Sequence, residues 1–380
     1  MQVLAVDVGT GTQDIYLFRS GLGLENGFKM VMPSPTMRAR RRIREATARG
    51  EDVLLTGVTM GGGPSAWGAE DHLRAGRKLF ATPDAARSFN DDLDWVRREM
   101  GVVVVSEEEA RRLRDVVGIG LRDFDYEAIA AAFDAFGVDL APEAVAVAVF
   151  DHGAAPPDIS DRKFRFDFLL ERLSRASRLP GFAFLSDQIP PAMTRMRAVG
   201  QSAGGLGCPL VVMDTAPAAV LGATLDPRVG ERRRCLVANV GNFHTLAFRL
   251  GPTGIEGLFE HHTGLVDQPK LEGLLEGLAA GTLSREAVFA DMGHGALLFD
   301  DRPLPLDEGE WGVAVTGPRR AMLAGSRLRP YFAVPYGDMM IAGCFGLLAA
   351  TAELLPDLGE PIRLALAGSG AGTPPWEAAD

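Results

Sequence analysis

The chain has 380 residues, of which 47% are hydrophobic, and it carries a formal net charge of -11 at pH 7. This length is greater than one ordinary hydrophobic core needs, and it predicts two domains. The acidic balance argues against nucleic acid or an anionic membrane as the main partner, because both repel a negatively charged surface. A bound nucleotide is compatible with this charge, since backbone N–H groups and a cation can meet its phosphates locally.

The amino terminus has no basic region followed by an apolar segment, and no run of about eighteen apolar residues offers a membrane span. We therefore expect a cytoplasmic protein. The cysteines Cys208, Cys235 and Cys344 are too widely separated to form a close-spaced metal or iron–sulfur cluster. We expect each to be a small buried hydrophobic residue, with a cluster shared between two chains as the alternative.

The first eighteen residues carry the most informative pattern. An apolar run at 3–6 leads into Asp-Val-Gly-Thr-Gly-Thr-Gln-Asp at 7–14, and a second apolar run follows at 15–18. This order predicts a strand, a tight turn and a second strand. The turn has glycines that let the backbone approach an anion, hydroxyls that bond phosphate oxygens, and a carboxylate, Asp7, that can hold a metal ion. The stretch therefore predicts phosphate binding.

The following segment predicts a strand at 27–32, a basic helix at 38–48 and a buried strand at 53–57. The last strand leads to Gly61-Gly62-Gly63, which fits a ligand-binding edge of an α/β sheet and an ordinary connection equally well. Further helices are predicted at 107–116 and 128–136, and we expect an inserted helical segment over about residues 85–140.

The next two strong strand patterns are each followed by an acidic residue. The strand predicted at 145–150 leads to Asp151-His152-Gly153, which can bind a metal or move protons, or can form a turn with the histidine exposed. The strand predicted at 209–213 leads to Asp214 and a helix of small residues with Pro217 in its first turn. Because small side chains let another helix approach closely, two domains joined at this helix could pivot.

A second hairpin of the same design begins at residue 234. Its apolar run ends in Asn-Val-Gly-Asn-Phe-His-Thr at 239–245 and turns back into another apolar run at 246–248. Two hairpins of one design, far apart in the sequence, predict two related half-domains that face each other across a nucleotide.

The carboxyl-terminal part predicts a strand followed by a glycine turn at 313–318 and a second helix of small residues at 337–350. We expect this helix to cross the one that follows Asp214. A last strand is predicted at 362–367, and the glycine-rich residues 368–372 fit a contact to a nucleotide or a frayed tail.

The histidines suggest metal chemistry. His261 and His262 are adjacent on a predicted strand and point in different directions, so both on one metal would be unusual. His294 lies in Asp-Met-Gly-His-Gly at 291–295, which predicts a loop with a flexible side chain. His244, His261 and His294 could still converge on one ion.

Taken in order, these motifs resemble those of the superfamily that contains actin, sugar kinases and the heat-shock chaperone ATPase. The resemblance implies an α/β protein with two ribonuclease-H-like domains of the actin-like ATPase fold, which close on ATP and Mg²⁺ in a cleft between them. It implies an amino-terminal domain at 1–224, which carries the inserted segment, and a carboxyl-terminal domain at 225–380.

The resemblance also implies a role for each motif. Residues 7–12 and 239–245 are similar to the two phosphate motifs of the superfamily, and residues 313–318 are similar to its adenosine motif. Asp7 would act with the metal ion, and Asp214 would orient the nucleophile. The nucleotide-binding residues implied in this way are Gly9, Thr10, Gly11, Thr12, Asn239, Gly241, Asn242, His244, Thr245, Gly317, Gly337 and Asp338.

The chain also resembles a prokaryotic family whose members are often labelled pyruvate formate-lyase activating enzymes. Three motifs carry this resemblance: Asp-Val-Gly-Thr-Gly-Thr-Gln-Asp, Asn-Val-Gly-Asn-Phe-His-Thr and Pro-Tyr-Gly-Asp-Met-Met. That label implies radical chemistry that needs three closely spaced cysteines. The chain does not have them, so we do not carry the label over to its function.

Three positions depart from the superfamily pattern. Asn239 stands where the second phosphate motif usually begins with aspartate, and an amide cannot neutralise a cation or accept a proton at neutral pH. Pro318 replaces the second glycine of the adenosine motif and removes a backbone donor. Asp214 is one residue out of step with the chaperone's glutamate. We therefore expect slow or absent hydrolysis.

Three functions stay open. The first is an ATP-dependent phosphotransferase or ATPase that acts with Mg²⁺ on a small-molecule acceptor or a protein partner. The second, favoured by Asn239, is a non-catalytic nucleotide sensor that regulates a partner enzyme. The third is a metal-dependent hydrolase that uses His152, His244 and His294.

Overall fold

The computed structural model describes residues 1–368, and within them the chain is an α/β protein with three β-sheets. The first large sheet contains, in spatial order, β3 (Phe28–Pro33), β2 (Thr12–Arg19), β1 (Gln2–Val8), β8 (Ala144–Val149), β10 (Leu210–Asp214) and β9 (Ala183–Leu185). The second large sheet contains β14 (Gly295–Leu298), β13 (Gly254–His262), β12 (His244–Gly251), β11 (Cys235–Val240), β15 (Val313–Thr316) and β16 (Pro330–Phe332). The small sheet contains β6 (Val103–Val104), β5 (Leu79–Ala81), β4 (Asp52–Gly57) and β7 (Val116–Leu121).

The two large sheets share one strand arrangement. In the first, β2 is antiparallel to both β1 and β3, while β8 is parallel to β1 and β10. In the second, β12 is antiparallel to both β11 and β13, while β15 is parallel to β11 and β16. The two predicted hairpins are therefore equivalent parts of the two sheets, β1–β2 and β11–β12.

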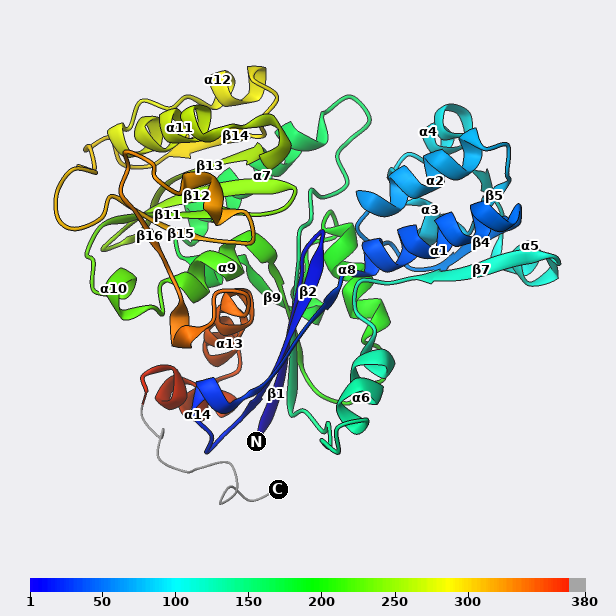
Figure 1. The fold of residues 1–380 in the computed structure, drawn as a ribbon, viewed down its shortest axis with the longest axis horizontal. Helices are drawn as coiled ribbons and strands as arrows, with labels where there is room; N and C mark the ends of the chain where they lie inside the picture. Colours follow the sequence, from blue (N-terminus) through cyan, green and yellow to red (C-terminus); the bar gives the residue numbers. More distant parts are fainter. Residues whose placement is uncertain (369–380) are drawn as a thin grey trace.

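Sheets and helices alternate in layers (Figure 1). Helices α7 (Asp161–Arg175), α9 (Thr215–Ala223) and α13 (Ala342–Leu354) share one hydrophobic core with the facing sides of both large sheets. Helices α6 (Tyr126–Asp134) and α8 (Thr194–Ser202) cover the outer face of the first sheet, and α11 (Gln268–Ala280) and α12 (Arg285–Ala290) that of the second. Strands covered on both faces need apolar side chains on both, which explains the run Ala-Val-Ala-Val-Ala-Val in β8.

Helices α9 and α13 cross in the middle of this core. A Cβ added at Gly222 of α9 would lie 1.7 Å from the carbonyl oxygen of Ala342, and one added at Gly346 of α13 would lie 1.9 Å from that of Ala218. The backbones therefore touch where the side chains are smallest. The predicted crossing of the two small-residue helices is confirmed.

The predicted strand at 362–367 is wrong, because this segment belongs to helix α14 (Pro356–Leu366). Pro356 occupies the first turn of the helix, where proline is tolerated. Leu358, Ile362 and Leu366 recur every four residues and pack on the central core, so a helical period buries them together. Residues 369–372 of the predicted glycine-rich contact lie outside the described residues.

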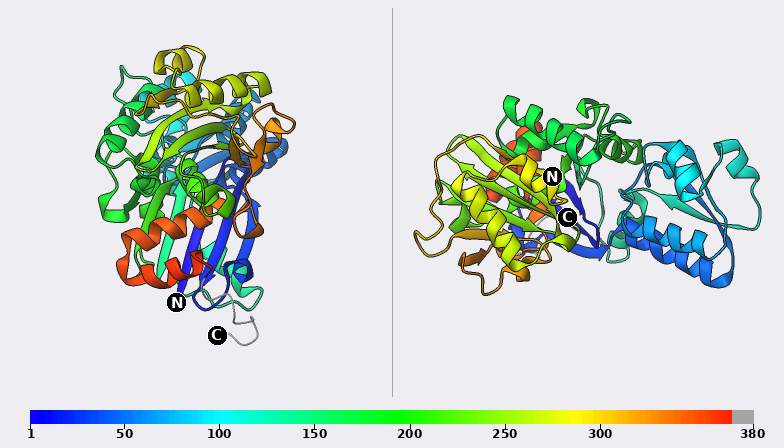
Figure 2. Two further views of the ribbon diagram at one scale, coloured as in Figure 1. Left: turned by 90° about the vertical axis from the view of Figure 1, so that its left-hand side faces the viewer. Right: turned by 90° about the horizontal axis from the view of Figure 1, so that it is seen from above.

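The small sheet forms a separate unit beside the first large sheet (Figures 1 and 2). It has its own hydrophobic core with α1 (Pro35–Arg49), α2 (Pro64–Arg74) and α3 (Pro83–Ala86). The segment expected to be a helical insertion, about 85–140, has α4 (Leu93–Trp95), α5 (Glu107–Arg112) and α6, but also β6 and β7. The predicted helix at 107–116 ends at Arg112, because the β-branched Val116 and Val117 begin β7, which pairs with β4.

The remaining short elements connect these layers. They are α10 (Pro227–Gly230), a π-helical turn (Val96–Met100) and 3₁₀ turns at Leu24–Asn26, Leu179–Phe182, Ser186–Gln188, Thr263–Leu265, Arg320–Leu323 and Pro335–Gly337. No helix in residues 1–368 has both the length and the apolar character that crossing a membrane requires. All three cysteines are free; Cys235 and Cys344 are buried as expected, and Cys208 is half-buried.

Candidate functional site

The turns of the two equivalent hairpins face each other. Each is closed by the same hydrogen bond, in which the N–H of Gly9 or Gly241 donates to the carbonyl oxygen three residues further on, at 2.9 Å and 3.0 Å. Gly11 lies against Asn242, since a Cβ added at Gly11 would be 2.6 Å from Asn242 Nδ2. The structure thus brings the two predicted phosphate motifs together from opposite sheets.

A cavity with a volume of about 300 Å³ opens beside the turns. The expected site residues that line it are Asp7, Gly9, Thr10, Thr12, Asn239, Gly241, Asn242, His244 and Gly317. The others, Gly11, Asp214, Thr245, Gly337 and Asp338, are not in its wall. Thr245 is fully buried and bonds the hydroxyl of Thr263, and the Asp338 carboxylate accepts from the N–H of Met340, which does line the cavity.

Two buried carboxylates, Asp7 and Asp14, lie at the cavity wall. The Thr215 hydroxyl donates to Asp7 Oδ1 at 2.5 Å, and a Cβ added at Gly343 of α13 would lie 1.8 Å from Asp7 Oδ2. Asp14 Oδ1 has no hydrogen-bond partner among the described residues. Burial raises the pKa of Asp7 to about 7, and burial together with the neighbouring Asp7 charge raises the pKa of Asp14 to about 8. This pair suits a divalent cation with oxygen ligands.

The glycine loop at 61–63 supplies another part of the cavity wall. It follows β4 of the small sheet and precedes α2. Its Gly61 N–H donates to the Asp123 carboxylate, which also forms a two-point ion pair with Arg195 at 2.7 and 2.9 Å. Arg195 Nη1 in turn donates to Phe150 O after β8. The glycine loop therefore lies at the cavity wall, and its role as a ligand-binding edge stays a prediction.

Asp214 takes part in a buried ion network rather than in the cavity wall. Its Oδ1 accepts from the N–H of Ala216 and caps α9, and its Oδ2 accepts from Arg165 Nη1 at 2.7 Å. Arg165 Nε donates to Glu260 Oε2 at 2.7 Å, and its guanidinium lies 4.0 Å from the centre of the Phe150 ring. Both Asp214 oxygens are therefore engaged by the protein itself.

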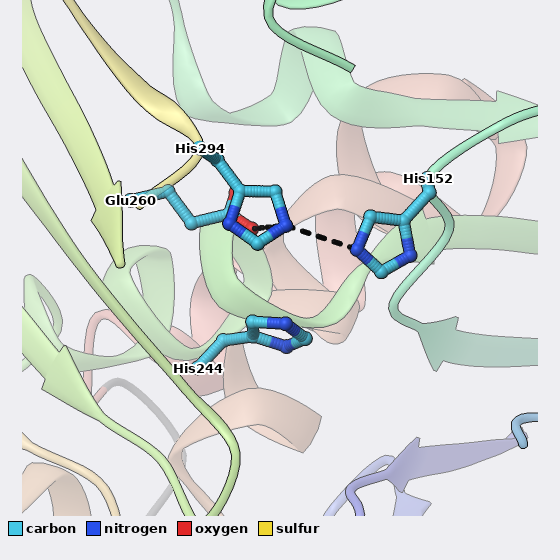
Figure 3. Close-up of side chains that lie close together, drawn as sticks. All are labelled: His152, His244, Glu260 and His294. Atoms are coloured by element: carbon cyan, nitrogen blue, oxygen red, sulfur yellow. Dashed lines mark hydrogen bonds and ion pairs between the residues drawn. The ribbon is translucent and has the colours of Figure 1, made fainter. Parts of the chain in front are cut away.

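Three histidines and Glu260 meet beside this network (Figure 3). His152 Nε2 lies 3.0 Å from His294 Nε2, which lies 3.4 Å from Glu260 Oε1. His244 stacks on the Phe150 ring at 4.2 Å between ring centres. One nitrogen or oxygen atom from each of His152, His244, Glu260 and His294 falls within 4.8 Å of the others.

The environment keeps these imidazoles neutral. Burial lowers the pKa of His152 to about 3 and holds the pKa values of His244 and His294 well below the usual range, and neighbouring positive charges on Arg165 act in the same direction. Burial raises the pKa of Glu260 to about 7, against the lowering effect of Arg165.

The cluster differs in two ways from the expectations drawn from the sequence. His294 is fully buried and not flexible, because Gly295 continues directly into β14 and packs against Phe166 of α7. His261 does not join the other histidines, since its Nε2 bonds Asp291 O. The set His152, His244 and His294 of the third alternative is the one that the fold brings together.

Sequence reasoning missed Glu260 and Arg165. Alternation along β13 would have placed Glu260 and His262 on one face and His261 on the other, and the His262 ring is indeed 4.7 Å from that of His294. Arg165 lies in a helix pattern with many other charges, and no local signal distinguishes it.

Comparisons with known proteins give low identities over most of the chain. It is similar to a ROK hexokinase from Thermus thermophilus, with 15% identity, coverage of 92% of this chain and 98% of that chain, and a TM-score of 0.28. It is also similar to an exopolyphosphatase-like protein, with 10% identity, coverage of 100% and 93%, and a TM-score of 0.29. For the Aquifex aeolicus PPX-GPPA enzyme the identity is 10%, the coverage 98% and 90%, and the TM-score 0.24. No curated protein matches the sequence.

The protein-family comparison is more direct. Residues 60–322, well over half of the chain, match the family described as "Putative pyruvate format-lyase activating enzyme (DUF1786)". This is the prokaryotic family that the two hairpin motifs and the motif Pro-Tyr-Gly-Asp-Met-Met resemble. The chain belongs to this family.

Proposed function

We propose that the protein binds ATP with Mg²⁺ in the cavity beside its two hairpin turns. The observation that carries this proposal is the meeting of two turns with the same closing hydrogen bond, one from each large sheet, next to the buried Asp7 and Asp14 carboxylates. Backbone N–H groups in glycine turns bind phosphate oxygens, and a carboxylate pair holds the accompanying cation.

The proposed fold is that of the actin-like ATPases, with ribonuclease-H-like domains at 1–224 and 225–380 and a nucleotide cleft between them. The repeated strand arrangement of the two large sheets supports this division. The crossing of α9 and α13 supports it too, because these are the helices expected to connect the two domains. The small sheet, at 52–121, would be the insertion within the first domain.

The cation site has donors that fit Mg²⁺. Asp14 Oδ1 is buried without a partner in residues 1–368, and Asp7 Oδ2 lies against the backbone of Gly343, so both oxygens are confined at the cavity wall. Because burial raises the pKa of Asp7 to about 7 and of Asp14 to about 8, binding of a cation to these carboxylates would release protons. When bound, Mg²⁺ would neutralise the charge of the phosphates and orient them.

The other residues have distinct proposed roles. Gly9, Thr10 and Thr12 of the first turn, with Gly241 and Asn242 of the second, would bind the phosphates. Gly317, Met339 and Met340, which also line the cavity, would contact the nucleoside. Asp214 would be a positioning residue, which holds Arg165 and the start of α9, because its two oxygens already accept hydrogen bonds.

An acceptor would have polar partners on the small unit, where Arg87, Asn90 and Asp91 line the cavity.

A phosphotransferase or ATPase and a non-catalytic sensor would use the same binding site and would differ in the rate of ATP turnover. Asn239, which lines the cavity as an uncharged side chain, favours slow turnover and supports the sensor reading. If the protein is a sensor, nucleotide binding would regulate a partner protein.

Calorimetric titration of the metal-free protein with ATP and ADP, with and without Mg²⁺, tests the proposal. We expect one nucleotide per chain and tighter binding of ATP in the presence of Mg²⁺. ADP release measured on the same samples separates an enzyme from a sensor. Absence of nucleotide binding under both conditions would reject the proposal.

A further inference from the structure

The group of His152, His244, Glu260 and His294 has a surplus of buried polar atoms. His244 Nε2, His294 Nδ1 and Glu260 Oε1 have no hydrogen-bond partner within residues 1–368. Burying such an atom without a partner is unfavourable, because it loses its hydrogen bonds to water. His294 faces His152 and Glu260 through Nε2, so its Nδ1 lies on the other side of the ring. The unpaired His244 Nε2 and Glu260 Oε1 therefore indicate a further group that binds both of them.

We propose that these four residues bind one divalent transition-metal ion of the zinc class. One ligand atom from each residue lies within 4.8 Å of the others, and His294 Nε2 is 3.0 Å from His152 Nε2 and 3.4 Å from Glu260 Oε1. A tetrahedral zinc site with bonds of about 2.0–2.1 Å places neighbouring ligand atoms about 3.3–3.4 Å apart.

The chemistry of the donors selects the class of ion. Three imidazoles and one carboxylate suit zinc, iron, nickel or copper, whereas magnesium and calcium prefer oxygen ligands. The same distinction separates this group from the carboxylate pair of Asp7 and Asp14.

The surrounding contacts hold the ligands in place. Arg165 Nε donates to Glu260 Oε2 and leaves Oε1 turned toward His294, and Phe150 stacks on the His244 ring. Interactions of this kind orient metal ligands and adjust their basicity. Figure 3 shows the His152, His244 and His294 rings and the Glu260 carboxylate turned toward one another.

The ligands come from both halves of the fold. His152 follows β8 of the first large sheet, while His244, Glu260 and His294 belong to or directly precede β12, β13 and β14 of the second. A bound ion would therefore join the two halves. Because His152 and His244 line the cavity, the ion would lie at the cavity wall and could polarise a phosphoryl or carbonyl oxygen bound there.

Metal analysis of the full chain tests this site without nucleotide. After chelation and dialysis, the protein is titrated with Zn²⁺ or Co²⁺ alone, and bound metal is measured by mass spectrometry and by the visible absorption of Co²⁺. We expect one ion per chain. His152→Ala and His294→Ala should each weaken binding by more than about 100-fold, because even loss of an outer contact costs about 10–100-fold.

Two matched variants keep the result interpretable. His72→Gln changes a buried histidine in the small unit, which bonds Thr47 and Lys78 O, and Asp7→Asn changes the carboxylate pair. Both should keep the Zn²⁺ site. If a ligand variant fails to fold, the unfolding temperature of the natural chain still reports on the site, and Zn²⁺ should raise it.

Sub-stoichiometric Zn²⁺ and Co²⁺ without any thermal stabilisation would overturn the proposal. Metal binding that is lost in Asp7→Asn but kept in His152→Ala and His294→Ala would also overturn it, because the ion would then lie at the carboxylates. Since no nucleotide is present, the result does not depend on ATP binding.

Discussion

Asp7 and Asp14 are direct cross-strand partners in the first hairpin, and both carboxylates are buried at the cavity wall. Directly opposite residues of an antiparallel pair point to the same face of the sheet, so the two like charges are forced close together. Burial raises the pKa of Asp7 to about 7, and burial together with the neighbouring Asp7 charge raises the pKa of Asp14 to about 8. Two such carboxylates bind either protons or a cation. Which of these they bind affects both the affinity for ATP and the dependence of stability on pH.

Replacing Asp7 with asparagine should weaken Mg²⁺-ATP binding more than metal-free ATP binding. The amide keeps the size of the side chain and can still accept from Thr215, but it removes a charged cation ligand. Calorimetry of both ligands measures the difference. Asp158→Asn, an exposed carboxylate, is the control and should change neither. Equal losses for both ligands would mean that Asp7 only shapes the turn.

The stability of the cation-free protein should fall as pH rises. The folded pKa values of Asp7 and Asp14 lie above the ordinary value of 3.8, so the folded state holds protons that the unfolded state has released. The stabilisation from these protons is complete below about pH 4 and is lost as pH rises through about 7 to 8. Denaturant unfolding with chelator from pH 7 to pH 9 measures this slope, because above about pH 7 the buried histidines, whose lowered pKa values give the opposite slope, are neutral in both states.

Two comparisons identify the source of that slope. Asp14→Asn removes one of the two groups and should make the decrease in stability with pH less steep. Addition of Mg²⁺ at pH 8 should recover stability in the natural chain and less so in the variant. An unchanged slope in Asp14→Asn would mean that other groups dominate the pH dependence.

Asn239→Asp should raise ATP turnover, because it adds a carboxylate to the cavity wall at almost the same side-chain size. A tenfold increase would correspond to about 1.4 kcal/mol of activation free energy. Asn26→Asp makes the same exchange at an exposed position outside the cavity wall and should not reproduce the gain. If turnover is already substantial and Asn239→Asp lowers it, Asn239 takes part in a different chemistry and the sensor reading is wrong.

Gly222→Ala should destabilise the fold, because the new methyl group would meet the Ala342 carbonyl oxygen where α9 and α13 cross. Overpacking of this kind costs about 1–3 kcal/mol. Gly273→Ala in α11 is the matched control: it has open space around it, and the higher helix propensity of alanine should leave stability equal or higher. Thermal and denaturant unfolding compare the two. A neutral Gly222→Ala would show that the helices can separate at little cost.

Several features were predictable because they depend on neighbouring residues. The hairpins β1–β2 and β11–β12 follow from apolar runs on either side of glycine turns, and their positions are those expected. The small residues of α9 and α13 predict a close helix crossing wherever the helices meet. The segment 362–367 shows the limit of such reasoning, since a short apolar run fits a strand or a helix, and packing on the core decided for the helix.

The sequence by itself therefore determined the two turns, the strands around them and the helices that cross. Only the tertiary structure decided that Asp214 is held by Arg165, that Gly61 reaches the cavity wall, and that His152 meets His294. The physical reason is distance along the chain. Local sequence patterns indicate turns and the periodicity of strands and helices, but they do not indicate which distant residues will meet. The contact between His152 and His294 spans 142 positions and exists only after the two large sheets have packed on their shared core.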